Sequence, residues 1–453
     1  MADDPSPGTG AGARTATEEL EETPAHVAAE EEEEAVDALA VGAPAELLVS
    51  SLPEYLRAWG QRIRVGESGA LPIVAGLIVI VIFFQAERSQ FLSSLNIVNL
   101  LVQAAVFILL GAAEIYALVL SEIDLSTGYV AAVAGFVIAE LIAPPVNLPW
   151  WLGILGGFGA AAAIGLLQGS LITRLHVPSF VVTLAGLLFW EGVMIELANV
   201  DKTAVGGVIG ISSSSPVYKL VNSNMSPAAG WIVLVVVIGL FALVSITRAA
   251  RRRSQGLSAP PLSITIATIV IAAIGGILLV FVCNRNRGLL IPLKGVPWVI
   301  PFVGVVLLAW SVLLARTKFG RYIYAIGANP EAARRAGINV AWVRTFAFMF
   351  CSLTAGMAGL VYESRLGSMA TDIDGGSLVL YAVAAAVIGG ASLFGGRGKP
   401  IHALLGGIVI AAVFNGLGLM GISAAGQDMA TAIVLLVAAT VDALVRRRGA
   451  TGG

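Results

Sequence analysis

Twelve apolar runs dominate the sequence, and most approach the length that crosses a lipid bilayer. They lie at about 71–86, 97–120, 127–143, 150–173, 178–198, 229–247, 262–283, 297–315, 343–363, 376–394, 401–421 and 428–445. About 20 apolar residues in a helix span the hydrocarbon core of a bilayer. Only 12% of the residues are charged, about half the share of a soluble domain. The sequence therefore predicts an all-α, polytopic membrane protein with about twelve transmembrane helices. The first run is short and the fifth contains Glu191 and Glu196, so either of these two could form a re-entrant or tilted segment.

Residues 1–50 differ in composition from the rest of the chain. They are rich in acids, including the block Glu30–Glu34, and their only base is Arg14. They hold no large apolar cluster from which a core could form. They also lack the basic start and apolar run of a signal peptide. We expect a disordered, acidic cytoplasmic tail at 1–50, followed by a transmembrane domain at 51–448.

The positions of Lys and Arg predict the orientation of the chain. If the N-terminus lies inside, most bases fall on the cytoplasmic side, as the positive-inside rule requires. These bases gather at 57–64, 248–253, 316–344 and 446–448. One missing span would exchange the two sides downstream and remove the bias. We therefore expect both termini in the cytoplasm.

Two short segments recur at nearly one offset. Ser121–Ser126 resembles Thr371–Gly376, and Leu167–Ser170 resembles Phe414–Leu417. Because Asp124 is predicted inside and Asp374 outside, duplicated halves would have inverted topology, an arrangement common in transporters. Chance similarity between Gly- and Ala-rich helices is the other explanation.

No pattern in the chain predicts catalysis or a metal site. The nearest candidate for a phosphate-binding loop, Gly395–Pro400, lacks the first glycine and the final Ser or Thr of that motif. Two cysteines, Cys283 and Cys351, and three scattered histidines give no metal-ligand spacing. We expect no catalytic residue, no metal and no cofactor on this chain.

The most informative segment is Thr317–Asn339, on the predicted cytoplasmic side. Asn329 can cap a helix whose first residue is Pro330, with Glu331 in its first turn. Ala332 and the residues after it favour helix, and Gly337 can end it. The sequence predicts a two-turn helix between two spans, with a basic end, suited to docking a partner. It consists of Asn329, Pro330, Glu331, Ala332, Ala333, Arg334, Arg335 and Gly337.

This segment closely resembles the cytoplasmic coupling loop of the permease subunits of carbohydrate ATP-binding cassette (ABC) importers, the ribose, galactose and xylose group. Three further segments resemble the same family, in family order: Glu122–Gly128, His176–Leu184 and Gly389–Gly398. Glu122 replaces the glycine that is usual in the family. The resemblance covers roughly residues 70–445, and the stretch between about 212 and 300 is most similar to the D-xylose branch.

The resemblance implies a permease domain with a coupling loop at 316–343, in a bacterial-type cytoplasmic membrane. A binding protein delivers the sugar from outside, two permeases, here a homodimer, form the pathway in the lipid, and separate ATPase subunits bind ATP and Mg²⁺. No nucleic acid partner is implied. Arg334 and Arg335 either contact an acidic partner surface or stay solvated.

Polar residues inside spans are costly and often functional. Glu114 lies deep in the second span, and Gln103 lies three helical turns earlier on nearly the same face. Gln168 and Asn415 occupy matching places in the proposed repeat. These four residues are candidates for lining a sugar pathway, with polar packing between helices as the alternative. Asp124 and Ser126 are predicted to cap the third span.

Three alternatives remain open at this stage. An autonomous secondary transporter needs buried charges for ion coupling, and the spans offer few. An importer of the same superfamily could carry branched-chain amino acids, nucleosides or a signalling sugar. A membrane scaffold without transport fits Glu114 and the basic loops less well.

Overall fold

The computed structural model describes residues 71–200, 206–257, 261–288 and 291–450. The predicted acidic tail at 1–50 lies outside the described residues. The chain divides into two compact units, one of residues 1–60 and 243–268 and the other of residues 61–242 and 269–453. In the first unit, the described residues form the end of one helix, with Arg251, Arg252 and Arg253 in its last turn, and the start of the next. The second unit is described below.

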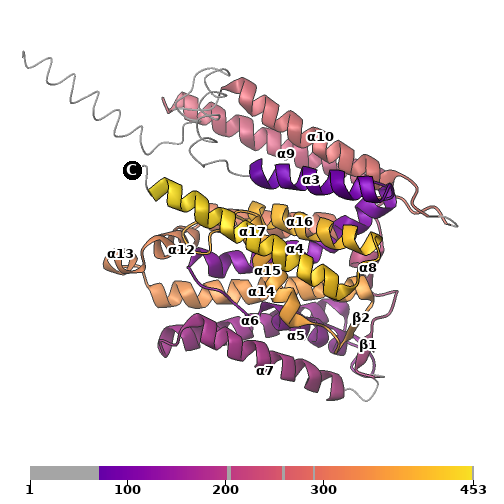
Figure 1. The fold of residues 1–453 in the computed structure, drawn as a ribbon, viewed down its shortest axis with the longest axis horizontal. Helices are drawn as coiled ribbons and strands as arrows, with labels where there is room; N and C mark the ends of the chain where they lie inside the picture. The colour runs from indigo at the N-terminus through magenta and orange to yellow at the C-terminus, as the bar shows by residue number, and fades with distance from the viewer. Residues whose placement is uncertain (1–70, 201–205, 258–260, 289–290, 451–453) are drawn as a thin grey trace, which may run out of the picture. The chain divides into compact units, whose positions relative to one another are not determined.

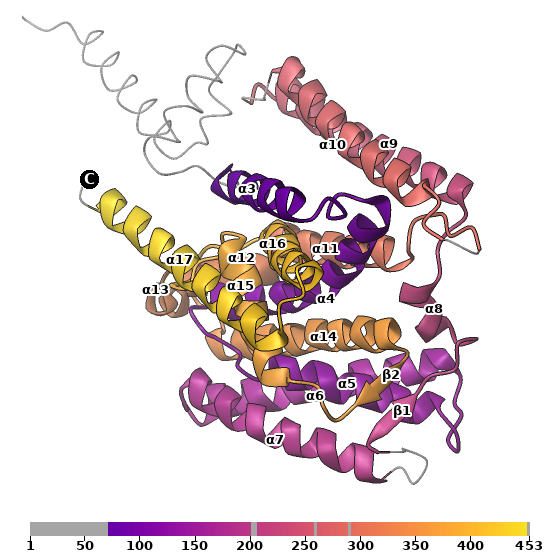
Figure 2. The same ribbon diagram turned by 45° about the vertical axis from the view of Figure 1, so that its right-hand side comes forward.

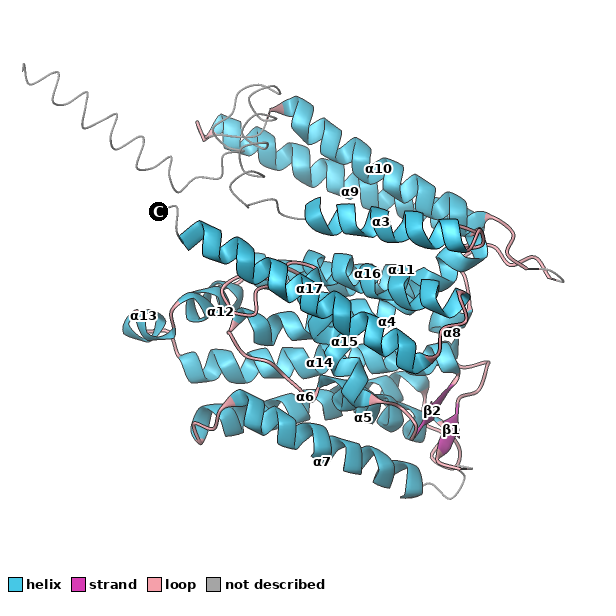
Figure 3. Cartoon of the chain, viewed as in Figure 1, coloured by secondary structure: helices cyan, strands magenta, loops and turns pink. Residues whose placement is uncertain are grey.

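Helices make up nearly all of the described structure (Figure 3). Twelve of them coincide with the predicted apolar runs. They are α3 (Leu71–Glu87), α4 (Ser94–Val119), α5 (Thr127–Ile142), α6 (Trp150–Arg174), α7 (Ser179–Val200), α9 (Pro227–Ser254), α10 (Leu262–Asn284), α11 (Val299–Arg316), α14 (Val340–Leu366), α15 (Gly375–Ile388), α16 (Pro400–Leu419) and α17 (Ala424–Ala450). Among the described residues, eight helices are long and apolar enough to cross a membrane, and four shorter apolar helices accompany them. The prediction of an all-α, multi-pass membrane protein is confirmed.

The remaining elements connect these helices. They are α8 (Pro216–Asn222), α12 (Lys318–Ala328) and α13 (Pro330–Arg335), with the strands β1 (Val208–Gly210) and β2 (Ser368–Ala370). The strands pair antiparallel, with Ile209 opposite Met369. Figures 1 and 2 both place this pair and α13 at opposite ends of the helices. We call these ends the β end and the α13 end.

Two details of the predicted boundaries are wrong. The run predicted at 376–394 is helical only to Ile388, because Gly389 and Gly390 end α15 and Gly390 takes a φ of +104°. Ser126 precedes α5, but its side chain makes no capping hydrogen bond. The Asp124 carboxylate instead accepts from the Ser126 backbone N–H at 3.0 Å.

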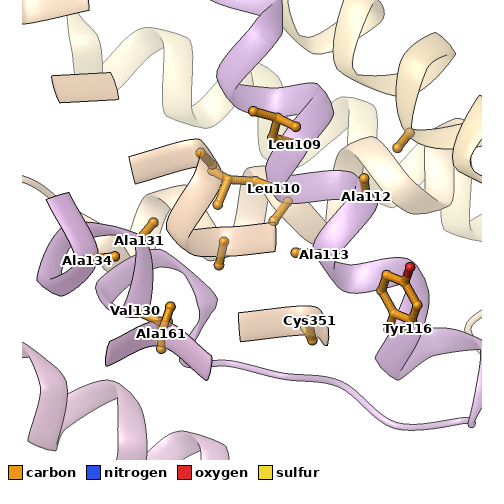
Figure 4. Close-up of a cluster of buried hydrophobic side chains, with 14 of the residues drawn as sticks. Leu109, Leu110, Ala112, Ala113, Tyr116, Val130, Ala131, Ala134, Ala161 and Cys351 are labelled. Carbon is orange, nitrogen blue, oxygen red and sulfur yellow. The ribbon is translucent and has the colours of Figure 1, made fainter. Parts of the chain in front are cut away.

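The core of the second unit consists of small and aliphatic side chains from α4, α5, α6 and α14 (Figure 4). Leu109, Ala113 and Cys351 are completely buried there. In lipid, close packing rather than water exclusion holds helices together, and small residues allow it. At Gly169 of α6, an added Cβ would lie 2.7 Å from Cα of Thr345 in α14. The packing of α6 on α14 therefore depends on this glycine.

The helix contacts follow a recurring pattern. α6 packs on α14 and α16 packs on α4, while α5 contacts α14 and α6, and α15 contacts α4 and α16. α7 lies against α5, and α17 lies against α15. Each of these contacts made by α4 to α7 thus has a counterpart in the series α14 to α17.

Candidate functional site

The segment between α11 and α14 folds as its residues predict. The Asn329 side chain accepts hydrogen bonds from the backbone N–H groups of Glu331, at 3.1 Å, and Ala332, at 3.0 Å. Pro330 is the first residue of α13, and Gly337 beyond its end has a φ of +81°. These features confirm the predicted cap, start and end of the short helix.

Most side chains of α13 face away from the protein. Glu331 forms ion pairs with Arg334 at 3.2 Å and with Arg335 at 3.5 Å. All three side chains are more than half exposed, whereas Ala333 is buried. Exposed pairs of this kind contribute little stability. The helix therefore presents mixed charge at the α13 end and is anchored mainly on one alanine.

The four segments that resemble one family meet at this end. The Ser121 hydroxyl donates to the carbonyl of Phe394 at 2.9 Å, and the N–H of Gly396 donates to the carbonyl of Val119 at 2.9 Å. The Tyr324 hydroxyl donates to the carbonyl of Gly398. The Thr183 hydroxyl donates to the carbonyl of Ile123 at 3.3 Å. Segments far apart in the sequence thus enclose the loop 120–126 and are linked to it and to one another by hydrogen bonds.

The loop 120–126 lies between α4 and α5, and its surroundings leave no room for larger residues. At Gly327, the penultimate residue of α12, an added Cβ would lie 1.8 Å from the carbonyl oxygen of Val119. Ser121 itself adopts a φ of +63°, which is uncommon for a residue other than glycine. The end of α4 is therefore held tightly between α12 and the loop 389–399.

Glu122 and Arg344 form an ion pair at the α13 end. Glu122 is 7% exposed, and the Arg344 side chain is one-third exposed. Burial raises the pKa of Glu122 above its ordinary value, and the facing guanidinium of Arg344 offsets this effect only in part. The pair joins the loop 120–126 to the second turn of α14. Sequence analysis did not connect these residues, because they lie more than 200 positions apart.

Behind this pair lies a buried polar cluster. It consists of Glu114, Asp124, Ser126, Thr127 and Gln168, each at most 2% exposed. The Thr127 hydroxyl donates to the Glu114 carboxylate at 2.8 Å, and the Ser126 hydroxyl donates to the Asp124 carboxylate at 2.6 Å. The Gln168 side-chain amide donates to the Ser126 hydroxyl at 3.0 Å. A chain of contacts thus runs from the loop 120–126 to α4, α5 and α6.

Of the four candidate pathway residues, the structure brings only Glu114 and Gln168 into this cluster. Gln103 is half-buried and makes no side-chain hydrogen bond to the described residues. Asn415 lies in α16, where its oxygen accepts from the Asn96 side chain of α4 at 2.7 Å. The hydrogen bonds of Asn415 and Gln168 join different helices, as polar packing contacts do.

Glu363 is a buried acid that the sequence analysis did not single out. It is completely buried in α14, and neither carboxylate oxygen has a hydrogen-bond partner among the described residues. Glu363 lies 249 positions after Glu114, close to the offset of the repeated segments. Extending that offset along the second span would have identified it.

Arg344 lines two cavities, and Glu122 lines one of them. One, of about 480 Å³, is lined by Thr173, His176, Arg334 and Arg344, among others. The other, of about 310 Å³, is lined by Glu122, Pro178, Arg334 and Arg344, among others. Within the described ranges, no group of three or more His, Cys, Asp or Glu side chains is placed to hold a metal ion. The α13 end therefore has two cavities lined by charged side chains.

Comparison with known families assigns this architecture. The family described as "Branched-chain amino acid transport system / permease component" matches residues 96–439, which include most of the helices and all four converging segments. The chain belongs to this family. It is the permease component of an ABC transporter, a transport subunit and not an enzyme.

Curated relatives of the permease are similar over nearly their whole length. The xylose transport system permease protein XylH of Escherichia coli strain K12 is 32% identical over 83% of this chain and 92% of its own. The ribose import permease protein RbsC of the same strain is 28% identical over 81% of this chain and 91% of its own. The D-allose transport system permease protein AlsC of Escherichia coli strain K12 is 26% identical over 82% of this chain and 90% of its own. No solved structure matches the chain.

Proposed function

We propose that this permease is the membrane-spanning subunit of an ATP-driven importer for a small sugar, D-xylose or a related monosaccharide. The observation that carries the proposal is α13: a capped, exposed, charged helix at the end where the four family segments meet. The sugar class rests on relatives named for xylose, ribose and D-allose. The family description names branched-chain amino acids, which form the second candidate cargo.

In this proposal α13 is the site where a separate ATPase subunit docks. A soluble extracytoplasmic binding protein delivers the sugar to the β end, and two copies of the permease enclose the pathway. The ATPase subunit, not this chain, binds ATP and Mg²⁺. Closure of the ATPase subunits moves α13, and the bundle then switches between outward and inward access.

We propose that all twelve apolar helices span the membrane, with both termini in the cytoplasm. The loops predicted on one side do contact one another: 120–126 meets 389–399 at the α13 end, and β1 meets β2 at the other. The matched contacts of α4–α7 and α14–α17 support an inverted repeat. Asp124 and Asp374 precede α5 and α15 at opposite ends, as inversion requires.

Glu114 and Gln168 are the pathway candidates that the contacts favour. They come from two helices, α4 and α6, and meet through the loop that the α13 end holds. A neutral sugar is bound by hydrogen-bonding groups, and Gln168 supplies both a donor and an acceptor. Gln103 and Asn415 remain weaker candidates for the same role.

The test is copurification of the ATPase subunit with a variant of α13. Replacing Glu331 and Arg334 together by Gln removes the exposed pair and leaves the net charge unchanged. We expect the variant to insert normally in the membrane but to recover much less ATPase subunit. A matched control is the exposed acid and base Asp372→Asn with Lys219→Gln, both at the β end. Normal recovery with the α13 variant would refute docking at this helix.

A further inference from the structure

Among the described residues, the ion pair between Glu122 and Arg344 is the only one that lies between α13 and the buried polar cluster. Glu122 comes from the loop after α4, and Arg344 comes from the second turn of α14. The pair therefore ties this loop to α14.

On one side, α13 and the start of α14 are joined firmly. The N–H of Ile338 donates to the carbonyl of Ala333 at 3.1 Å, and the N–H of Gly337 donates to that of Arg334 at 3.0 Å. The Asn339 side chain then caps α14 by accepting from the N–H of Trp342 at 3.0 Å. A displacement of α13 must therefore carry the first turns of α14, and Arg344 with them.

On the other side, Glu122 is two residues from Asp124. The Asp124 carboxylate holds both the backbone N–H and the hydroxyl of Ser126, and that hydroxyl accepts from Gln168. Each of these side chains is buried, so water cannot replace these hydrogen bonds when the loop shifts. Movement of Glu122 therefore reaches α6 through two hydrogen bonds.

The two cavities provide the space that such movement needs. Arg344 lines both of them, and so does Arg334 of α13. A tightly filled surround would hold the pair in one position, whereas these spaces let Arg344 and Glu122 shift together. Energetic coupling between two sites requires elements that have two discrete arrangements.

We propose that Glu122 and Arg344 are positioning residues that transmit displacement of α13 to the loop 120–126, and through it to the Gln168 cluster. The proposal rests on the proposed function, since it assumes that the ATPase subunit acts on α13. Neither residue touches the sugar. Their effect is on how much sugar is transported for each ATP hydrolysed, not on docking of the ATPase subunit.

The experiment measures the uptake of labelled D-xylose and ATP hydrolysis in the same proteoliposomes, with the full complex and its binding protein. The variants are Glu122→Gln, which keeps the side-chain volume, Arg344→Met, and the exchange Glu122→Arg with Arg344→Glu. Arg174→Met is the control, since Arg174 is an exposed base at the end of α6, outside the coupling loop 316–343, without an ion pair to the described residues.

We expect each single variant to retain the ATPase subunit and its basal hydrolysis while the uptake per ATP falls roughly two- to thirty-fold, the range for residues that carry coupling. The exchange variant should recover at least half of the lost uptake per ATP, and Arg174→Met should match the wild type. Unchanged coupling in Glu122→Gln and Arg344→Met would overturn the proposal. So would a loss that the exchange variant does not reverse, since a merely local packing role gives that result.

The wild-type arm separates this proposal from the proposed function. ATP-dependent uptake by the wild type with unchanged coupling in the variants refutes the relay alone. No ATP-dependent uptake of D-xylose or another monosaccharide by the wild type refutes both.

Discussion

Removal of the Asn329 cap tests whether the helical form of α13 is what the ATPase subunit binds. In Asn329→Ala, the N–H groups of Glu331 and Ala332 lose their acceptor. Loss of an Asn cap costs about 1 kcal/mol, within a range of about 0.5 to 2 kcal/mol. A helix of six residues cannot persist by itself, because helix nucleation is unfavourable. The cap is therefore a large part of what holds α13 in shape.

A loss of about 1 kcal/mol lowers the ratio of helical to unfolded α13 by about fivefold. The apparent affinity for a partner that binds only the helical form falls with the fraction that remains helical. We therefore expect the Kd of the ATPase subunit to rise by up to about fivefold in Asn329→Ala. Asn329→Ser and Asn329→Asp keep an acceptor oxygen, and Asp adds a charge that favours the helix start, so both should stay within about twofold of wild type.

The assay titrates the ATPase subunit onto the permease in lipid nanodiscs, with hydrogen exchange measured at residues 331–336. Faster exchange in Asn329→Ala with an unchanged Kd would show that the ATPase subunit does not depend on α13. Unchanged exchange in all three variants would instead refute the cap argument itself.

Three further predictions follow from other contacts. Gly327→Ala should lower the free energy of unfolding of the solubilised permease, measured by thermal unfolding, by about 1–3 kcal/mol or more, since its Cβ would meet the carbonyl of Val119. A free energy of unfolding equal to that of the wild type would contradict the close approach of α12 and α4. Asn96→Ala should cost about 1–3 kcal/mol by leaving the buried oxygen of Asn415 without its donor, and the double change with Asn415→Leu should recover part of that loss in the same thermal assay. Because burial raises the pKa of Glu122, the folded form holds its proton more tightly than the unfolded form. The stability that Glu122 contributes is therefore greatest at acid pH and declines as pH rises above the ordinary glutamate pKa. Glu122→Gln should therefore show a flatter profile of unfolding temperature against pH than the wild type. Parallel profiles would refute the raised pKa of Glu122.

The helices and the α13 cap could be predicted from the sequence, because both depend on nearby residues. A run of apolar residues must be helical in lipid whatever its neighbours, since the backbone has no other partner there. The signal at Asn329, Pro330 and Gly337 lies within nine residues and reflects local backbone chemistry. The early end of α15 was missed because the apolar run continues past Gly389 and Gly390, and the two glycines alone mark the boundary.

Features that depend on distant residues were not predictable. The strands β1 and β2 have three residues each, too few for an alternating pattern to be recognised. The pairing of Glu122 with Arg344 joins two segments whose local patterns say nothing of each other. Gln168 was predicted as a pathway residue from its place in the repeat, but its partner Ser126 could be identified only from the packing of α5 against α6.

The most direct test of the central claim is sugar uptake by the purified permease in proteoliposomes, alone and with its ATPase subunit and binding protein. We predict uptake of a monosaccharide only when all three components and ATP are present. Glu114, Asp124 and Glu363 are buried acids of the kind that couple transport to ions. Accumulation of sugar by the permease alone, driven by an ion gradient without ATP, would therefore contradict the account.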